Sequence, residues 1–202
     1  MKKEEIQNRI LEESYNLFKK HGIHFVTMDL IARRLGMSKK TLYVYFGSKE
    51  DILLNSMQKR NKERKEQIES IFRSTDNIIE GLITMMQKIS REIGEINPVM
   101  FEELERYYPK ILKLVAKNRV ENIDQITKLL RQGQNKGLIL ANLNIDIISK
   151  LLLGQVELIM NHELFPSPEY PRNELFNHMY ISFVRGISTA EGQKIISDIM
   201  EK

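Results

Sequence analysis

Lysine, threonine and tyrosine side chains that could bind nucleic acid are concentrated in one short stretch of the sequence, residues 38–49. Lysine ammonium groups can bind phosphate oxygens or the acceptor edge of guanine, and hydroxyl groups can donate to a phosphate or a base edge. This chemistry requires an exposed helix face that enters the major groove near its N-terminal end. The candidate DNA-contacting residues in this stretch are Ser38, Lys39, Lys40, Thr41, Tyr43, Val44 and Tyr45.

Each of these side chains could contact DNA or could serve a structural purpose instead. Lys39 or Lys40 could read a guanine or hold a phosphate, and Thr41 could donate to a phosphate. The hydroxyls of Tyr43 and Tyr45 could reach the DNA backbone or a base edge. The alternatives are that the two tyrosines pack in the core and that the two lysines belong to a solvated face.

Two short helices joined by a tight turn are expected to position these residues. Thr27 is a candidate N-cap of the first helix, because its hydroxyl can accept an unpaired backbone N–H of the first turn. Gly36 ends that helix, since glycine readily takes the left-handed conformation that a sharp exit needs. Ser38 caps the second helix, about residues 39–46, in which Leu42 and Phe46 point inward. The pattern predicts a helix-turn-helix whose recognition helix is residues 39–45.

With its flanks, this pattern resembles the N-terminal signature of the TetR-type transcriptional regulators, with a close match over about residues 6–57. By this resemblance, Thr27 and Lys49 occupy the positions of two phosphate contacts of the family. Val44 departs from the family, which often has a larger polar or aromatic side chain there. A valine can offer only apolar contact, for example to a thymine methyl group. The residues that carry the resemblance are Thr27, Ile31, Ala32, Gly36, Ser38, Thr41, Leu42, Tyr43, Tyr45, Phe46, Ser48, Lys49, Glu50 and Leu53.

The apolar periodicity of the whole chain predicts an all-α protein of roughly nine or ten helices. We expect an N-terminal three-helix helix-turn-helix domain for DNA binding, residues 1–48, and a larger helical domain for ligand binding and dimerisation, residues 49–202. Ile23, Phe25 and Val26 are expected to be buried in the linker before the second helix. The predicted helices span about residues 4–20, 28–35, 39–46, 49–72, 78–93, 99–108, 109–136, 145–165 and 173–187, with a short one in the tail.

Charge is distributed unevenly along the 202 residues. Residues 1–65 carry 15 Lys and Arg against 8 Asp and Glu, a formal charge of +7, whereas the remainder carries 16 against 19, or −3. Positive charge therefore accompanies the helix-turn-helix, as phosphate binding requires. The sequence contains 0 cysteines, which excludes disulfides and thiolate sites. It shows no apolar leader and no uninterrupted membrane span, so we expect a cytoplasmic protein.

Two partners besides DNA are expected. One recognition helix spans few base pairs, and a homodimer presents two of them about 34 Å or more apart. The helices at residues 145–165 and 173–187 could form the dimer seam, or could only complete the monomer core. By the family resemblance, the middle helices could enclose a small inducer, which we expect to be apolar or aromatic. The candidate ligand-binding residues, all of which could equally be ordinary core, are Met85, Met86, Met100, Phe101, Tyr107, Tyr108 and Leu114.

No other chemistry is indicated by the sequence. The four histidines do not show metal-site spacing, and His162 with Glu163 is better explained as a surface pair, so no metal and no cofactor are expected. Glu102, Glu103 and Glu105 are expected to lie on a solvated helix face. Nucleotide-binding and hydrolase motifs are absent, so we do not expect an enzyme. The sequence indicates a repressor released by a ligand; a ligand-independent regulator or activator, and a helical enzyme or carrier, are the alternatives.

Overall fold

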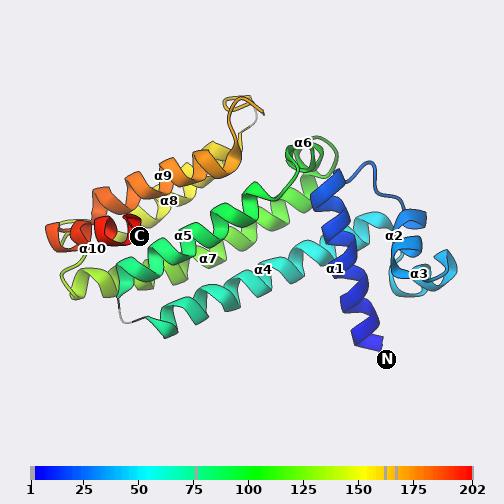
Figure 1. The fold of residues 1–202 in the computed structure, drawn as a ribbon, viewed down its shortest axis with the longest axis horizontal. Coiled ribbons are helices and arrows are strands. Elements are labelled where there is room, and N and C mark those ends of the chain that lie inside the picture. Colours follow the sequence, from blue (N-terminus) through cyan, green and yellow to red (C-terminus); the bar gives the residue numbers. More distant parts are fainter. Residues whose placement is uncertain (1–2, 76, 162, 167, 202) are drawn as a thin grey trace. The chain divides into compact units, whose positions relative to one another are not determined.

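The computed structural model describes residues 3–75, 77–161, 163–166 and 168–201. These residues form ten α-helices and one isolated antiparallel bridge between Ile139 and Ser188 (Figure 1). The all-α prediction is confirmed. The helices are α1 (Lys3–His21), α2 (Met28–Leu35), α3 (Lys39–Tyr45), α4 (Lys49–Ser74), α5 (Ile78–Gly94), α6 (Pro98–Tyr107), α7 (Pro109–Asn135), α8 (Ile145–Met160), α9 (Arg172–Ile187) and α10 (Ala190–Met200).

The chain divides into two compact units, each with its own apolar core. The first comprises Met1–Arg64 and Glu95–Ala116, and the second comprises Lys65–Gly94 and Lys117–Lys202. The long helices α4 and α7 each contribute to both units. The first unit therefore contains α6 as well as the helix-turn-helix. A functional boundary at residue 48 stays a prediction.

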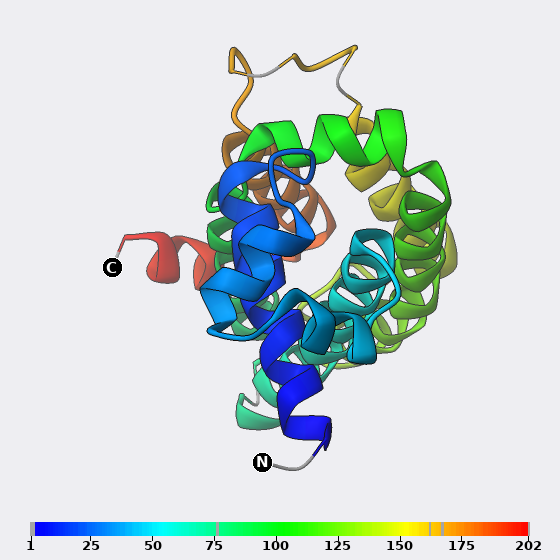
Figure 2. The ribbon, with the colours of Figure 1, turned by 90° about the vertical axis from the view of Figure 1, so that its right-hand side faces the viewer.

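The first unit is held together by apolar side chains from α1, α2, α3 and the start of α4. Ile10 and Phe18 of α1 and Ile31 of α2 are fully buried, and Leu42 of α3 and Ile52 of α4 pack into the same cluster. Figures 1 and 2 show α1, α2 and α3 gathered at the N-terminal end of α4. Because α2 and α3 are only 8 and 7 residues long, this shared burial rather than intrinsic propensity stabilises them.

The second unit is built around α5, which packs along α9 and against α10. Ile79, Leu82 and Ile83 of α5 are 0 to 1% exposed, and Val184 of α9 and Ile196 of α10 are fully buried beside them. Their burial makes α5 the central helix of this unit. No helix among the described residues is long and apolar enough to span a bilayer.

Two expectations about local structure are wrong. Phe25 is 67% exposed, whereas Ile23 and Val26 are fully buried. Those two side chains fill the inner face of the turn, and the Phe25 ring instead lies 5.6 Å from the His21 ring. The helix expected at residues 145–165 ends at Met160, because Asn161 leaves the helical conformation and its side chain accepts the N–H of Leu164 at 2.9 Å.

Candidate nucleic-acid interface

Capping side chains set the geometry of the α2–turn–α3 motif. The Thr27 hydroxyl accepts the N–H of Leu30 at 3.2 Å and begins α2, and the Ser38 hydroxyl accepts the N–H of Thr41 at 3.0 Å and begins α3. Between them Gly36 takes a left-handed conformation with φ +67°, and its N–H returns to the end of α2. Since a residue with a side chain is strained at that φ, Gly36 allows the sharp turn.

Helix α3 buries one face and exposes the other. Leu42 is fully buried and Phe46, at its C-terminal cap, is 6% exposed, so these two side chains anchor the helix. On the opposite side Tyr43 is 47% exposed and Val44 is 72% exposed. Core packing therefore does not account for Tyr43, whereas Tyr45 is half-buried and packs against the core of the first unit.

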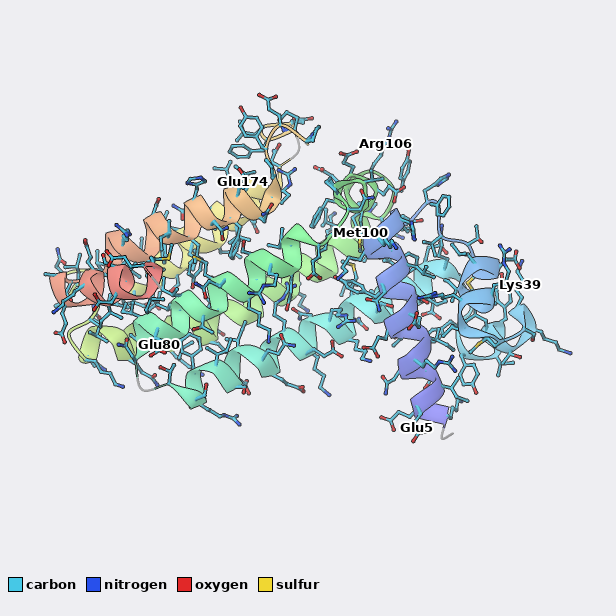
Figure 3. The ribbon with its side chains drawn as sticks, in the orientation of Figure 1. Glu5, Lys39, Glu80, Met100, Arg106 and Glu174 are labelled. Carbon is cyan, nitrogen blue, oxygen red and sulfur yellow. The ribbon has the colours of Figure 1, made fainter. Side chains whose placement is uncertain are left out.

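The cationic and hydroxyl groups at the start of α3 are also at the surface. Lys39 donates to the Asp29 carboxylate of α2 at 3.0 Å, and this hydrogen bond, together with the Asp29 charge, raises the pKa of Lys39. Lys40 and Thr41 are exposed, and the Thr41 hydroxyl lies 2.8 Å from the Ser38 hydroxyl. Figure 3 shows Lys39 at the outer surface of α3.

The two residues assigned from the family pattern lie on either side of α3 in the chain. Thr27 is exposed and caps α2. Lys49 is half-buried in the first turn of α4, and its ammonium group donates to the carbonyl oxygen of Ile23 at 3.0 Å. An ammonium group has three N–H donors, so this bond leaves capacity for a phosphate oxygen.

A further group on α6 contacts the turn before α2. The Glu103 carboxylate accepts the backbone N–H groups of Ile23 and His24, and Glu103 is half-buried. The expectation that Glu103 lies on a plain solvated face is therefore wrong. The partners are 80 and 79 residues away in the sequence, so no local pattern could identify the contact.

The candidate ligand residues are divided between the two units. Met85 and Met86 are buried in the core of the second unit. The others belong to the first unit, where Met100 is 1% exposed beneath α1, Tyr107 is 57% exposed and Leu114 is 39% exposed. Phe101 and Tyr108 are half-buried. Burial, and then the charges of Glu50 and Glu103, raise the pKa of Tyr108.

The second unit also contains a groove that sequence reasoning missed. It lies between the last turns of α4 and the C-terminal part of α7 and has a volume of about 330 Å³. Apolar and polar side chains from two helices line it together, a combination that periodicity within one helix cannot reveal. The lining residues are Ile68, Glu69, Phe72, Arg73, Gln125, Lys128, Leu129 and Gln132.

One face of α8 exposes a row of aliphatic side chains. Ile147, Leu151 and Leu158 are 56%, 55% and 51% exposed. With the exposed Gly154 they occupy positions i, i+4, i+7 and i+11, which align along one side of a helix. We call Ile147, Leu151, Gly154 and Leu158 the α8 stripe. About half of each of these aliphatic side chains is exposed in the described part of the chain, which leaves apolar area that a partner could cover.

Metal ligands do not converge in the described part of the chain. No group of three or more His, Cys, Asp or Glu side chains there could hold an ion. His21 and His24 lie near the turn before α2, and His178 is exposed on α9. His162 lies outside the described residues, so the pair it forms with Glu163 in the sequence stays an interpretation.

Comparison with known proteins shows which proteins this chain resembles. Residues 10–55 match the sequence profile of the bacterial regulatory proteins of the tetR family. The HTH-type transcriptional regulator YvaF of Bacillus subtilis (strain 168) is 28% identical over 173 residues, which cover 85% of this chain and 86% of YvaF.

Two crystal structures share the fold. A Saccharomonospora viridis protein described as a transcriptional regulator, in complex with choline, superposes with a TM-score of 0.72 at 21% identity, covering 93% of this chain and 100% of the other. The transcriptional regulator FadR of Bacillus subtilis, in complex with stearoyl-CoA, gives a TM-score of 0.64 at 18% identity, covering 90% and 98%. The fold of this chain is thus shared with these two proteins over nearly its whole length.

Proposed function

Because this chain belongs to the TetR family of bacterial transcriptional regulators, and is a DNA-binding regulator rather than an enzyme, we propose that it acts as a homodimeric repressor in the cytoplasm. Each protomer inserts α3 into the major groove of an operator that overlaps a promoter. A small apolar or aromatic ligand then releases the dimer from DNA. The single observation that supports this proposal most strongly is the outward face of α3.

The α3 surface has the chemistry that groove reading needs. Lys40, Thr41 and Tyr43 offer donors, and Val44 offers an apolar contact for a thymine methyl group. Thr27 and Lys49 hold phosphates on either side and set the register of the helix on the duplex. The formal charge of +7 on residues 1–65 supports approach to DNA.

Dimerisation is supported by the α8 stripe. Aliphatic side chains in a continuous row on an exposed helix mark a protein interface more often than a solvated surface. Helices α8 and α9 of one protomer would pack on the same helices of the other, which makes a four-helix seam with twofold symmetry. The symmetry of the seam then requires an operator with two half-sites.

The ligand is proposed to bind among the apolar side chains of the second unit, with Met85 and Met86 as adaptable contacts. The complex of Bacillus subtilis FadR with stearoyl-CoA supports a ligand with a long apolar portion. Release follows if the ligand binds more tightly to the protomer arrangement that cannot place both α3 helices on one duplex. The choline complex favours a cationic ligand as the second candidate class.

The proposal is tested by selecting duplexes from a random library with the full-length protein, then measuring binding of the selected duplex by gel shift. We expect an operator with two related half-sites, bound by the wild type and lost in Tyr43→Ala combined with Lys40→Ala. Acyl-CoA thioesters and choline are then added separately. Release by neither would support the ligand-independent alternative, and failure to select any duplex would overturn the proposed operator binding.

A further inference from the structure

We infer that Glu103 on α6 is a positioning residue for DNA binding, which acts through the Ile23–His24 backbone on Lys49. This inference rests on the proposed phosphate contact of Lys49. It adds a residue outside the helix-turn-helix to the set that determines DNA affinity.

The connection between Glu103 and Lys49 runs through the backbone of one short turn. The Glu103 carboxylate accepts the N–H of Ile23 and, at 3.1 Å, the N–H of His24. The carbonyl oxygen of Ile23 accepts an N–H of Lys49 at 3.0 Å. The Ile23 residue is fully buried, so it is held by packing as well as by these bonds. Glu103 thus accepts the N–H group of Ile23, and Lys49 donates to the carbonyl oxygen of the same residue.

Other groups of the same unit hold α6 against the end of α1. The backbone N–H of Asn97 donates to the carbonyl oxygen of Lys19 at 2.8 Å, and the Asn97 side chain donates to that of Lys20 at 3.2 Å. Lys19 forms an ion pair with Glu95 at 2.7 Å. These contacts place the first turns of α6 beside the turn before α2.

Gly22 makes the close approach of Glu103 possible. It has φ +81°, and a Cβ there would lie 3.0 Å from a Glu103 carboxylate oxygen and 3.2 Å from Val99. The turn therefore leaves room for the carboxylate directly over its N–H groups. Hydrogen bonds from N–H groups to an ionised carboxylate are shorter and stronger than those between neutral groups.

The consequence for DNA binding follows from the flexibility of lysine. A free lysine side chain must be ordered when it binds a phosphate, and that loss of rotamer freedom opposes binding. In this protein the carbonyl oxygen of Ile23 already restrains the Lys49 ammonium group. Glu103 keeps that carbonyl group in place, so it lowers the cost of ordering Lys49 without touching DNA itself.

The experiment is a double-mutant cycle on duplex binding by the full-length protein. Dissociation constants are measured by fluorescence anisotropy over a range of salt concentrations, with the duplex selected from the random library. The variants are Glu103→Ala, Lys49→Ala and the double substitution. Glu103→Gln is the conservative variant, since its amide oxygen can accept the same N–H groups, and Glu105→Ala is the matched control on an exposed position of α6.

We expect Glu103→Ala to weaken binding about fivefold in the wild-type background, and less than about twofold in Lys49→Ala. Glu103→Gln should recover most of the affinity, and Glu105→Ala should bind like the wild type. An equal loss in both backgrounds would overturn the inference, because it would assign Glu103 a purely structural role. If Glu103→Ala does not fold, Glu103→Gln is the variant that is measured. Full affinity of Glu103→Gln supports the inference, and a loss of its affinity with an unchanged salt dependence opposes it.

The outcome separates this inference from the function on which it rests. If Lys49→Ala leaves both affinity and salt dependence unchanged, the phosphate contact of Lys49 fails and the inference fails with it. If Lys49→Ala weakens binding and Glu103→Ala does not, only the role of Glu103 is rejected.

Discussion

Helices α3 and α8 both expose apolar side chains, but their surroundings differ. On α3, Val44 is 72% exposed and stands among lysine, threonine and tyrosine side chains. On α8, Ile147, Leu151 and Leu158 form a row of aliphatic groups, each more than 50% exposed. An isolated apolar group among donors suits a polar groove that offers occasional methyl groups, whereas a continuous row suits another protein surface. The difference supports our proposal that one exposed face serves DNA binding and the other serves self-association.

Leu151→Glu on α8 should have the largest effect on dimerisation and on operator binding. A carboxylate in the middle of the stripe would be buried opposite its own copy in a symmetric dimer, where it cannot be paired. We expect a monomer by sedimentation and a loss of operator affinity of about 100-fold or more, since the two α3 helices no longer bind as one unit. Lys150→Glu, one residue earlier and off the α8 stripe, is the control. A dimeric Leu151→Glu protein would contradict the assignment of the α8 stripe to the dimer interface.

Lys40→Ala on α3 should have the next largest effect and leave the dimer intact. Loss of one cationic contact per protomer, and so of two in the dimer, should weaken operator binding about tenfold and lower the salt slope by about two. Lys194→Ala, an exposed lysine of α10, should change neither quantity. If the slope is retained while the preference for one guanine disappears, Lys40 reads a base rather than a phosphate.

Val44→Ala should have a smaller effect that depends on the DNA. Removing two methyl groups from a contact with thymine should weaken binding about threefold, as expected when little apolar area is lost. Replacing the contacted thymine by uracil should weaken the wild type by a similar factor and leave Val44→Ala unaffected. Equal sensitivity of both proteins to uracil would show that Val44 does not contact that methyl group.

The ends of α2 and α3 could be predicted from the sequence because their determinants are local. The hydroxyls of Thr27 and Ser38 each bond an N–H three residues later, and Gly36 takes its conformation without help from the fold. The side of α3 that is buried follows from the spacing of Leu42 and Phe46. These features agree with the structure because no distant residue decides them.

The parts that could not be predicted depend on distant contacts. Periodicity marks Met85 and Met100 alike as buried, but it does not tell which core each enters, and they belong to different units. Glu103 resembles its neighbours Glu102 and Glu105 until the fold brings the turn at Ile23 to it. Phe25 is likewise exposed because Ile23 and Val26 occupy the buried positions of this turn.

Asp29→Asn should have the smallest effect and should act in the opposite direction, by strengthening DNA binding. Asp29 is exposed on α2 and pairs with Lys39 at 3.0 Å, so it both engages a cation of α3 and repels phosphates. An exposed ion pair contributes little to stability, so the fold should tolerate its removal. We expect affinity for the operator to rise about two- to threefold at low salt, with the gain fading as salt screens the charges.

The matched control is Glu191→Gln on α10, which removes one negative charge from an exposed site outside the helix-turn-helix. Weaker binding by Asp29→Asn would mean instead that Asp29, from α2, orients Lys39 for its contact with DNA.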